Sequence, residues 1–99
     1  MQLKFRISLC LLGTLMVSSA HAQEAVKGVV ELFTSQGCAS CPPADEALRK
    51  MIRKGDVVGL SYHVDYWNYL GWADSLASKE NTERQYGYMR ALGRNGVYT

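Results

Sequence analysis

The sequence predicts an α/β fold built on a parallel strand–helix–strand unit, and three observations lead to this prediction. Residues 26–33 and residues 57–64 are rich in β-branched and aromatic side chains, and both are nearly continuous in apolar character. Strands that are covered on both faces have this composition. Between them, residues 42–54 place apolar side chains at helical spacing, which predicts a crossover helix.

The N-terminal residues have the pattern of a secretory signal peptide. Lys4 and Arg6 give a basic start, residues 7–17 form an apolar core, and Ala-His-Ala at residues 20–22 forms a small-x-small cleavage site. The apolar core is too short to span a membrane as a mature helix. We therefore expect cleavage after Ala22, a periplasmic or secreted location, no membrane anchor, and a mature domain of residues 23–99.

Loss of the leader changes both the charge and the cysteine count. The sequence has 11 Lys and Arg against 9 Asp and Glu, and Lys4 and Arg6 belong to the leader, so residues 23–99 carry no net charge. Nothing in this balance favours a nucleic-acid partner. Cys10 is also in the leader, which leaves Cys38 and Cys41 as an even pair in an oxidising compartment.

The two cysteines stand between the first predicted strand and the predicted helix. At this position the first thiol, Cys38, faces unsatisfied backbone N–H groups and the positive end of the helix dipole, which favour a thiolate. The second, Cys41, lies one turn further along and can attack a mixed disulfide formed on Cys38. The pattern therefore indicates a Cys38–Cys41 disulfide and a site of thiol–disulfide exchange.

The predicted helix has clear start and stop signals. Pro42 and Pro43 fall in its first turn, where a missing N–H costs nothing, and Gly55 closes it. Its apolar stripe consists of Ala44, Leu48, Met51 and Ile52. Asp45 and Glu46 stabilise the helix start but oppose a nearby thiolate, so we expect a moderately activated Cys38.

Polar and aromatic residues follow the second predicted strand. Because sites gather beyond the carboxyl ends of parallel strands, topology brings His63, Asp65, Tyr66 and Trp67 toward the thiol pair. The conservative interpretation makes His63 a hydrogen-bonded core histidine and makes the aromatic residues a packed cover. The functional interpretation keeps Asp65, Tyr66 and Trp67 as a wall beside the thiols.

Glu31 interrupts the apolar first strand and also has two interpretations. It is either an acid at an edge of the sheet or a buried carboxylate behind the thiols that takes their protons.

A second helix is predicted from Ser78 to about Leu92, with Gly93 as its stop. Its expected buried face consists of Thr82, Tyr86, Met89 and Leu92. Residues 97–99 are predicted to begin a further strand. A sheet of so few strands leaves an unpaired edge and uncovered apolar faces, so we expect the sequence to be the N-terminal part of a longer domain.

Several blocks in a fixed order give the chain a family resemblance. They are residues 31–38, 41–45, 63–67, 70–72, 84–85 and 96–99. With these blocks the chain resembles the secreted thioredoxin-like family known as domain of unknown function 1223, from about Val29 to Thr99. It departs from that pattern at Asn68, where an aspartate is usual, and at Ser75 and Leu76, where a Pro-Phe pair is usual.

The resemblance implies a thioredoxin-like fold with no established activity. In such folds a cis proline commonly follows a segment like the one ending at Thr99 and packs against the thiol pair, so Thr99 is a candidate for a place near the site. Thioredoxins also carry a buried acid six residues before their first cysteine. Glu31 stands seven residues before Cys38, out of that register.

Three functions remain open at this point. The first is thiol–disulfide oxidoreduction on protein or small-molecule thiols, which needs no cofactor. The second is a non-catalytic binding module in which the disulfide is structural, although so short a loop constrains the unfolded chain little. The third is copper or zinc handling through Cys38, Cys41 and His63, because soft sulfur ligands suit these metals. One Cys-x-x-Cys does not supply a closed four-ligand zinc site, and no metal site is predicted.

Overall fold

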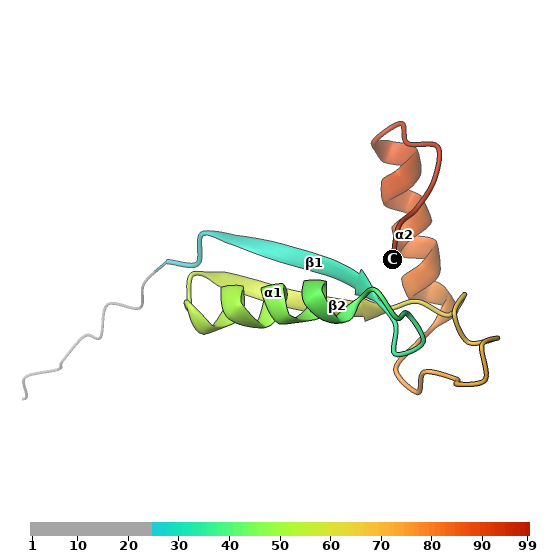
Figure 1. The fold of residues 1–99 in the computed structure, drawn as a ribbon. Helices are drawn as coiled ribbons and strands as arrows, with labels where there is room; N and C mark the ends of the chain where they lie inside the picture. The colour runs from blue at the N-terminus through green and yellow to red at the C-terminus, as the bar shows by residue number, and fades with distance from the viewer. Residues whose placement is uncertain (1–24) are drawn as a thin grey trace, which may run out of the picture.

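The computed structural model of the chain describes residues 25–99, and the predicted signal peptide lies outside them. The order of elements is β1 (Gly28–Thr34), α1 (Pro42–Arg53), β2 (Val57–His63) and α2 (Lys79–Ala91) (Figure 1). The two strands pair in parallel, with Gly28 opposite Val57 and Thr34 opposite His63. The chain therefore has the predicted α/β fold, consistent with part of a thioredoxin-like domain.

The alternation of side chains divides the sheet into two faces. On one face, Gly59 lies against Leu48 and Ile52 of α1, and Thr34 donates a hydrogen bond to Asp45 of the same helix. On the opposite face, Phe33 makes an edge contact with the ring of Tyr88 in α2. The crossover helix α1 and the C-terminal helix α2 thus contact opposite faces of the sheet.

α1 begins where the prolines predict and follows the Cys-x-x-Cys directly. Cys41 is its N-cap residue, and Gly55 leaves the helix with a φ of 79°. Of the predicted apolar stripe only Leu48 is buried, while Ala44, Met51 and Ile52 are exposed. A sheet of two strands is about 5 Å from strand to strand, narrower than a helix of about 10 Å, so it covers only the centre of the stripe.

α2 begins as predicted, but its buried face differs from the prediction. Ser78 is its N-cap and accepts a hydrogen bond from the backbone N–H of Asn81 at 3.1 Å. The buried residues are Thr82 and Gln85, whereas Tyr86 and Leu92 are exposed. The prediction followed hydrophobicity, and the helix instead buries polar side chains that bond to the segment after β2.

Residues 97–99 form no strand, which corrects the predicted start of a further one. A strand requires backbone hydrogen bonds to a neighbour. The carbonyl of Tyr98 instead accepts a hydrogen bond of 2.8 Å from the side chain of Gln85. The end of the chain is thereby held against α2.

The most buried residues lie at the carboxyl ends of the strands rather than along their length. Val64, directly after β2, is fully buried, and its N–H donates to the carbonyl of Thr34 at 2.9 Å. The other buried residues near this edge are Ser35, Cys38, Cys41 and Asp74. Further back, Val29, Val58 and Leu60 are exposed on the face away from α1. The packing is therefore densest around the candidate site.

Gly59 allows α1 to approach the sheet closely, and replacing it tests this packing. A Cβ at this position would lie 2.6 Å from two atoms of Ile52 and 3.0 Å from Leu48. We expect Gly59→Val to lower the free energy of unfolding by about 1–3 kcal/mol through overpacking, as measured by urea unfolding. Gly28→Val is the matched control, because a Cβ at Gly28 meets nothing within 4 Å. Equal stability of the two variants would contradict this account.

Candidate functional site

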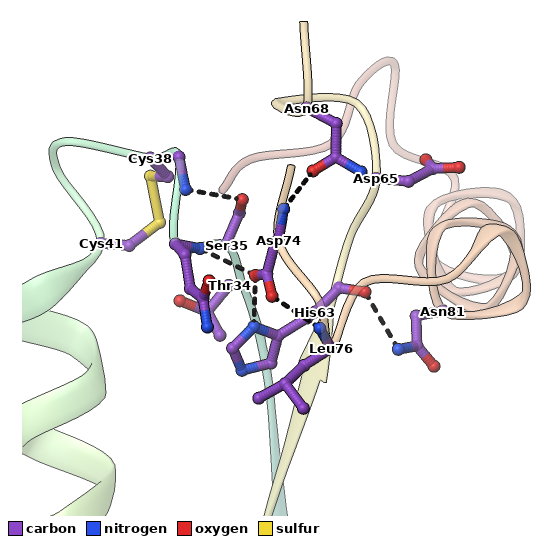
Figure 2. Close-up of polar contacts among 12 residues, drawn as sticks. Thr34, Ser35, Cys38, Cys41, His63, Asp65, Asn68, Asp74, Leu76 and Asn81 are labelled. Carbon is purple, nitrogen blue, oxygen red and sulfur yellow. Dashed lines mark hydrogen bonds and ion pairs between the residues drawn. A yellow bond between two sulfur atoms is a disulfide. The ribbon is translucent and has the colours of Figure 1, made fainter. Parts of the chain in front are cut away.

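Two successive turns carry the chain from β1 to the disulfide. The N–H of Cys38 donates to the carbonyl of Ser35, and the N–H of Cys41 donates to the carbonyl of Cys38, each at 3.2 Å. Cys38 and Cys41 form a disulfide with Cα atoms 5.4 Å apart (Figure 2). Their exposed fractions are only 4% and 5%. The predicted pair is thus formed, and both residues are shielded.

The helix start supplies fewer free N–H groups to the thiols than the sequence led us to expect. Pro42 and Pro43 have no N–H, and the N–H groups of Ala44 and Asp45 both donate to the carbonyl of Cys41. The helix dipole remains, but the first-turn donors do not point freely at Cys38. The hydroxyl of Ser40 lies 3.7 Å from Cys38 Sγ and is a donor available to a thiolate there.

The two acids of the first helical turn are both engaged in hydrogen bonds. Asp45 accepts from the hydroxyl of Thr34 at 2.7 Å, which ties the helix to the end of β1. Glu46 pairs with Arg49 and Arg53, each at 2.9 Å. The negative charge of Glu46 is therefore compensated on the helix surface, and the carboxylate of Asp45 is turned toward the strand.

The carboxyl group of Asp74 lies at the centre of this edge of the sheet. Figure 2 shows it between the imidazole of His63 and the turn that leads to Cys38. One oxygen, Oδ2, is 2.5 Å from His63 Nδ1 and accepts the N–H of Gln36 at 2.9 Å. The other, Oδ1, accepts the N–H of Leu76 at 2.8 Å. His63 is thus hydrogen bonded, as the conservative interpretation expected.

The hydrogen bonds to Asp74 compensate for its burial. Its side chain is fully buried, and this burial by itself raises the pKa of the carboxyl. The hydrogen bonds from Gln36 N–H, from His63 and from Leu76 N–H outweigh that effect and hold the pKa of the carboxyl below its usual range. Asp74 is therefore ionised at neutral pH, and its hydrogen bond fixes the hydrogen of the His63 ring on Nδ1.

The segment after β2 packs beside the turn that carries Cys38, as topology predicted. A Cβ at Gly37 would lie 3.1 Å from the backbone oxygen of Trp67, so the two segments are in close contact. The indole N–H of Trp67 is buried and has no hydrogen-bond partner within residues 25–99. Trp67 is thus the member of the predicted wall that meets the turn before Cys38.

Asp65 and Tyr66 point toward α2 instead of toward the thiols. Asp65 accepts a hydrogen bond of 2.6 Å from the hydroxyl of Thr82. The hydroxyl of Tyr66 donates to Gln85 Oε1 at 2.8 Å and also bonds to the hydroxyl of Thr99. These bonds connect the predicted wall, α2 and Thr99 in one network.

Glu31 lies on the sheet face opposite α1, so it is not behind the thiols. It accepts hydrogen bonds from Tyr62, from Arg84 and from Tyr88, and the guanidinium of Arg84 lies over both tyrosine rings. The hydrogen bonds from Tyr88 and Arg84 lower the pKa of the Glu31 carboxyl. Its polar partners give it a structural role between β1, β2 and α2.

The described residues do not assemble the metal site considered from the sequence. Among residues 25–99, no three His, Cys, Asp or Glu side chains are grouped so that they could hold a metal ion. His63 Nδ1 is bonded to Asp74, and both cysteines are joined to each other.

The sequence reasoning missed Asp74, Gln36 and Gln85 as members of the site. Asp74 stands in an aromatic loop without periodicity, so no spacing rule linked it to residues on other elements. The one signal available was an acid in an otherwise apolar stretch, because such a carboxylate needs partners when it is buried.

The sequence was compared with models of known protein families. The sequence model of a family described as "protein of unknown function (DUF1223)" matches residues 29–99. The chain belongs to this family.

The DUF1223 chain is also similar to a solved structure. This is the X-ray crystal structure of protein AGR_C_4864 from Agrobacterium tumefaciens, with 97% sequence identity and a TM-score of 0.74. The match covers 79% of the DUF1223 chain and 35% of the solved one. The chain thus spans about a third of that protein's length. None of the curated proteins matches it.

Within residues 25–99, neither helix of the DUF1223 chain has the length and apolar character that crossing a membrane requires.

The pH dependence of stability tests the role of Glu31. Because its pKa is lowered from 4.5 in the folded state, its stabilising effect is present above pH 4.5 and is lost as the pH falls through the lowered pKa. We expect Glu31→Gln to lower the free energy of unfolding at neutral pH, and the difference from the native chain to shrink in acid. Urea unfolding at a series of pH values measures both.

Glu83→Gln is the control, because Glu83 makes only an exposed pair with Lys79 at 3.6 Å. A loss of stability in Glu31→Gln that stays the same from neutral to acid pH would count against this role.

Proposed function

We propose that this chain carries the thiol–disulfide exchange site of an exported oxidoreductase. The observation that supports the proposal most is the Cys38–Cys41 disulfide directly before α1, at the carboxyl ends of two parallel strands. In parallel sheets this edge is where sites are built. One cysteine lies in the turn and the other at the N-cap of α1, so the two sulfurs have different surroundings. A two-step exchange needs one attacking and one resolving thiol.

The reaction proceeds in two balanced steps in the reducing direction. The thiolate of Cys38 attacks a substrate disulfide, which forms a mixed disulfide and releases one substrate thiolate. The thiolate of Cys41 then attacks Cys38 Sγ and releases the second, so two electrons pass from the cysteine pair to the substrate. The oxidising direction is the reverse. No cofactor takes part, and the substrate is a protein or small-molecule disulfide or thiol.

The roles of the two cysteines follow from their places in the chain. Cys41 is the N-cap of α1 and is held by the helix, while Cys38 precedes the helix by one turn. Ser40 provides a hydroxyl at Cys38 Sγ, and no corresponding side-chain donor contacts Cys41 within residues 25–99. These features favour Cys38 as the attacking thiol and Cys41 as the resolving one.

One observation favours a second candidate, a structural disulfide in a binding module. Both cysteines are nearly inaccessible, and a buried disulfide exchanges slowly because the attacking thiolate must reach a sulfur along the S–S axis. The signal-peptide pattern supports an oxidising location for either candidate. The reduction potential distinguishes them.

The first test is the reduction potential of the Cys38–Cys41 couple in the full-length protein, equilibrated against glutathione. We expect a value between about −120 and −270 mV, the range of exchange catalysts. Cys38→Ser should abolish turnover of a dithiol substrate. A potential below about −300 mV would indicate a disulfide that the compartment never opens, and the binding module would then be the better proposal.

Removal of the Ser40 hydroxyl tests the assignment of the attacking thiol. We expect Ser40→Ala to raise the pKa of the Cys38 thiol, because the thiolate loses a hydrogen-bond donor, and to slow alkylation of the reduced protein at neutral pH. A titration of thiolate ultraviolet absorbance gives the pKa. In a Cys41→Ser background the same shift should persist. A pKa shift seen only while Cys41 is present would mean that the Ser40 hydroxyl acts on the Cys41 thiol, which would contradict the assignment of Cys38.

A further inference from the structure

The buried carboxylate of Asp74 is hydrogen bonded to the turn that leads to Cys38. Asp74 accepts the backbone N–H of Gln36, two residues before Cys38, and its Oδ2 is shared with His63. The side chain of Gln36 is also held, because its Oε1 accepts the indole N–H of Trp72 at 2.8 Å. Two residues of the loop after β2, Asp74 and Trp72, thus form hydrogen bonds with the backbone and the side chain of Gln36.

Cys38 has no regular element of its own to hold it in place. Cys41 is fixed by α1, whereas Cys38 is held by two turns: its carbonyl accepts the N–H of Cys41, and its N–H donates to Ser35 at the start of the turn formed by Ser35, Gln36 and Gly37. In that turn the N–H of Gly37 bonds to Ser35 Oγ, and the N–H of Gln36 bonds to Asp74. Besides the local bond from the Cys41 N–H to the Cys38 carbonyl, the turn that leads to Cys38 is thus restrained by a hydrogen bond to a residue far away in the sequence.

We propose that Asp74, held by His63, is a positioning residue for the thiol pair that keeps Cys38 beside Cys41. This inference rests on the proposed exchange function and names what sets the equilibrium of that site. By restraining the turn, the carboxylate raises the effective concentration of one thiol at the other. A higher effective concentration favours the disulfide and speeds attack of Cys41 on a mixed disulfide at Cys38.

The bonding pattern explains why a carboxylate is needed at this position. The three groups that contact the two oxygens of Asp74 are all donors: two backbone N–H groups and the Nδ1–H of His63. An asparagine of the same size has one oxygen and one NH₂ group, and the NH₂ group would face a donor. At least one of the three bonds is then lost, and a buried donor is left unsatisfied.

Other charged groups near His63 are few. Asp45 and Arg49 of α1 line the same 230 Å³ pocket as the His63 ring, beside Thr34 and Ser61. The hydroxyl of Thr34 donates to Asp45, and Arg49 is paired with Glu46. From the α2 side, the uncharged side chain of Asn81 donates a hydrogen bond to the backbone carbonyl of His63. Among the described residues, Asp74 is therefore the charged group that is hydrogen bonded to the His63 ring.

The test is the reduction potential of the full-length Asp74→Asn protein, measured against a dithiothreitol buffer so that even a very stable disulfide is reduced. We expect the equilibrium constant for disulfide formation to fall about tenfold, which makes the potential about 30 mV less negative. Glu31→Gln is the matched control: it removes a carboxylate from the other face of the sheet, so it should lower stability and leave the potential unchanged. A potential that moves equally in both variants, or in neither, overturns the proposal.

A second pair of variants keeps the proposal testable if Asp74→Asn does not fold. His63→Ala removes the donor that holds Asp74 and should shift the potential in the same direction, whereas His63→Gln supplies an amide donor and should restore part of the native value. Equal potentials in the two His63 variants would overturn the proposal. An inert native disulfide would end the exchange function, yet the shift between variants would still report whether Asp74 positions the pair.

Discussion

The structure depends on one buried negative charge and the donors that compensate it. A carboxylate without solvent is unfavourable unless hydrogen bonds replace its water. Asp74 obtains these bonds from the turn before Cys38, from the end of β2 and from its own loop. Its side chain is fully buried, so each of these segments must remain in place to keep it satisfied. The carboxylate thus connects three segments at this edge of the sheet through hydrogen bonds.

The candidate site and the polar cluster around Glu31 lie on opposite faces of the sheet. The α1 face of the sheet carries the turn with the disulfide and the His63–Asp74 pair. The opposite face carries Glu31 with Arg84 and two tyrosines, a cluster that joins β1 and β2 to α2. One interpretation of the sequence makes Glu31 the buried acid behind the thiols. In the structure, the buried acid at that edge of the sheet is Asp74.

Burial of the disulfide limits access to both of its sulfurs. Both cysteines are buried, and a Cβ at Gly37 would make a close contact of 3.1 Å with the backbone oxygen of Trp67. For the proposed exchange, a substrate would have to reach a sulfur that is buried in this structure. Local opening of the turn before Cys38 would break the hydrogen bond between the Gln36 N–H and Asp74, so this bond opposes such opening.

The sequence by itself determined the elements and the thiol pair, because their signals are local. Prolines at the helix start, Gly55 at its end, Ser78 as an N-cap and the β-branched strands act within a few residues, and the structure confirms each of them. The parallel topology predicted that the residues after β2 would lie toward the thiol pair, and of these Trp67 contacts the turn before Cys38 whereas Asp65 and Tyr66 bond to α2. Only the tertiary structure decided which acid is buried, which face of α2 packs inward, and that Tyr98 bonds to Gln85 instead of entering a strand. These outcomes depend on hydrogen bonds between residues far apart in the chain, and no periodicity in the sequence records such pairings.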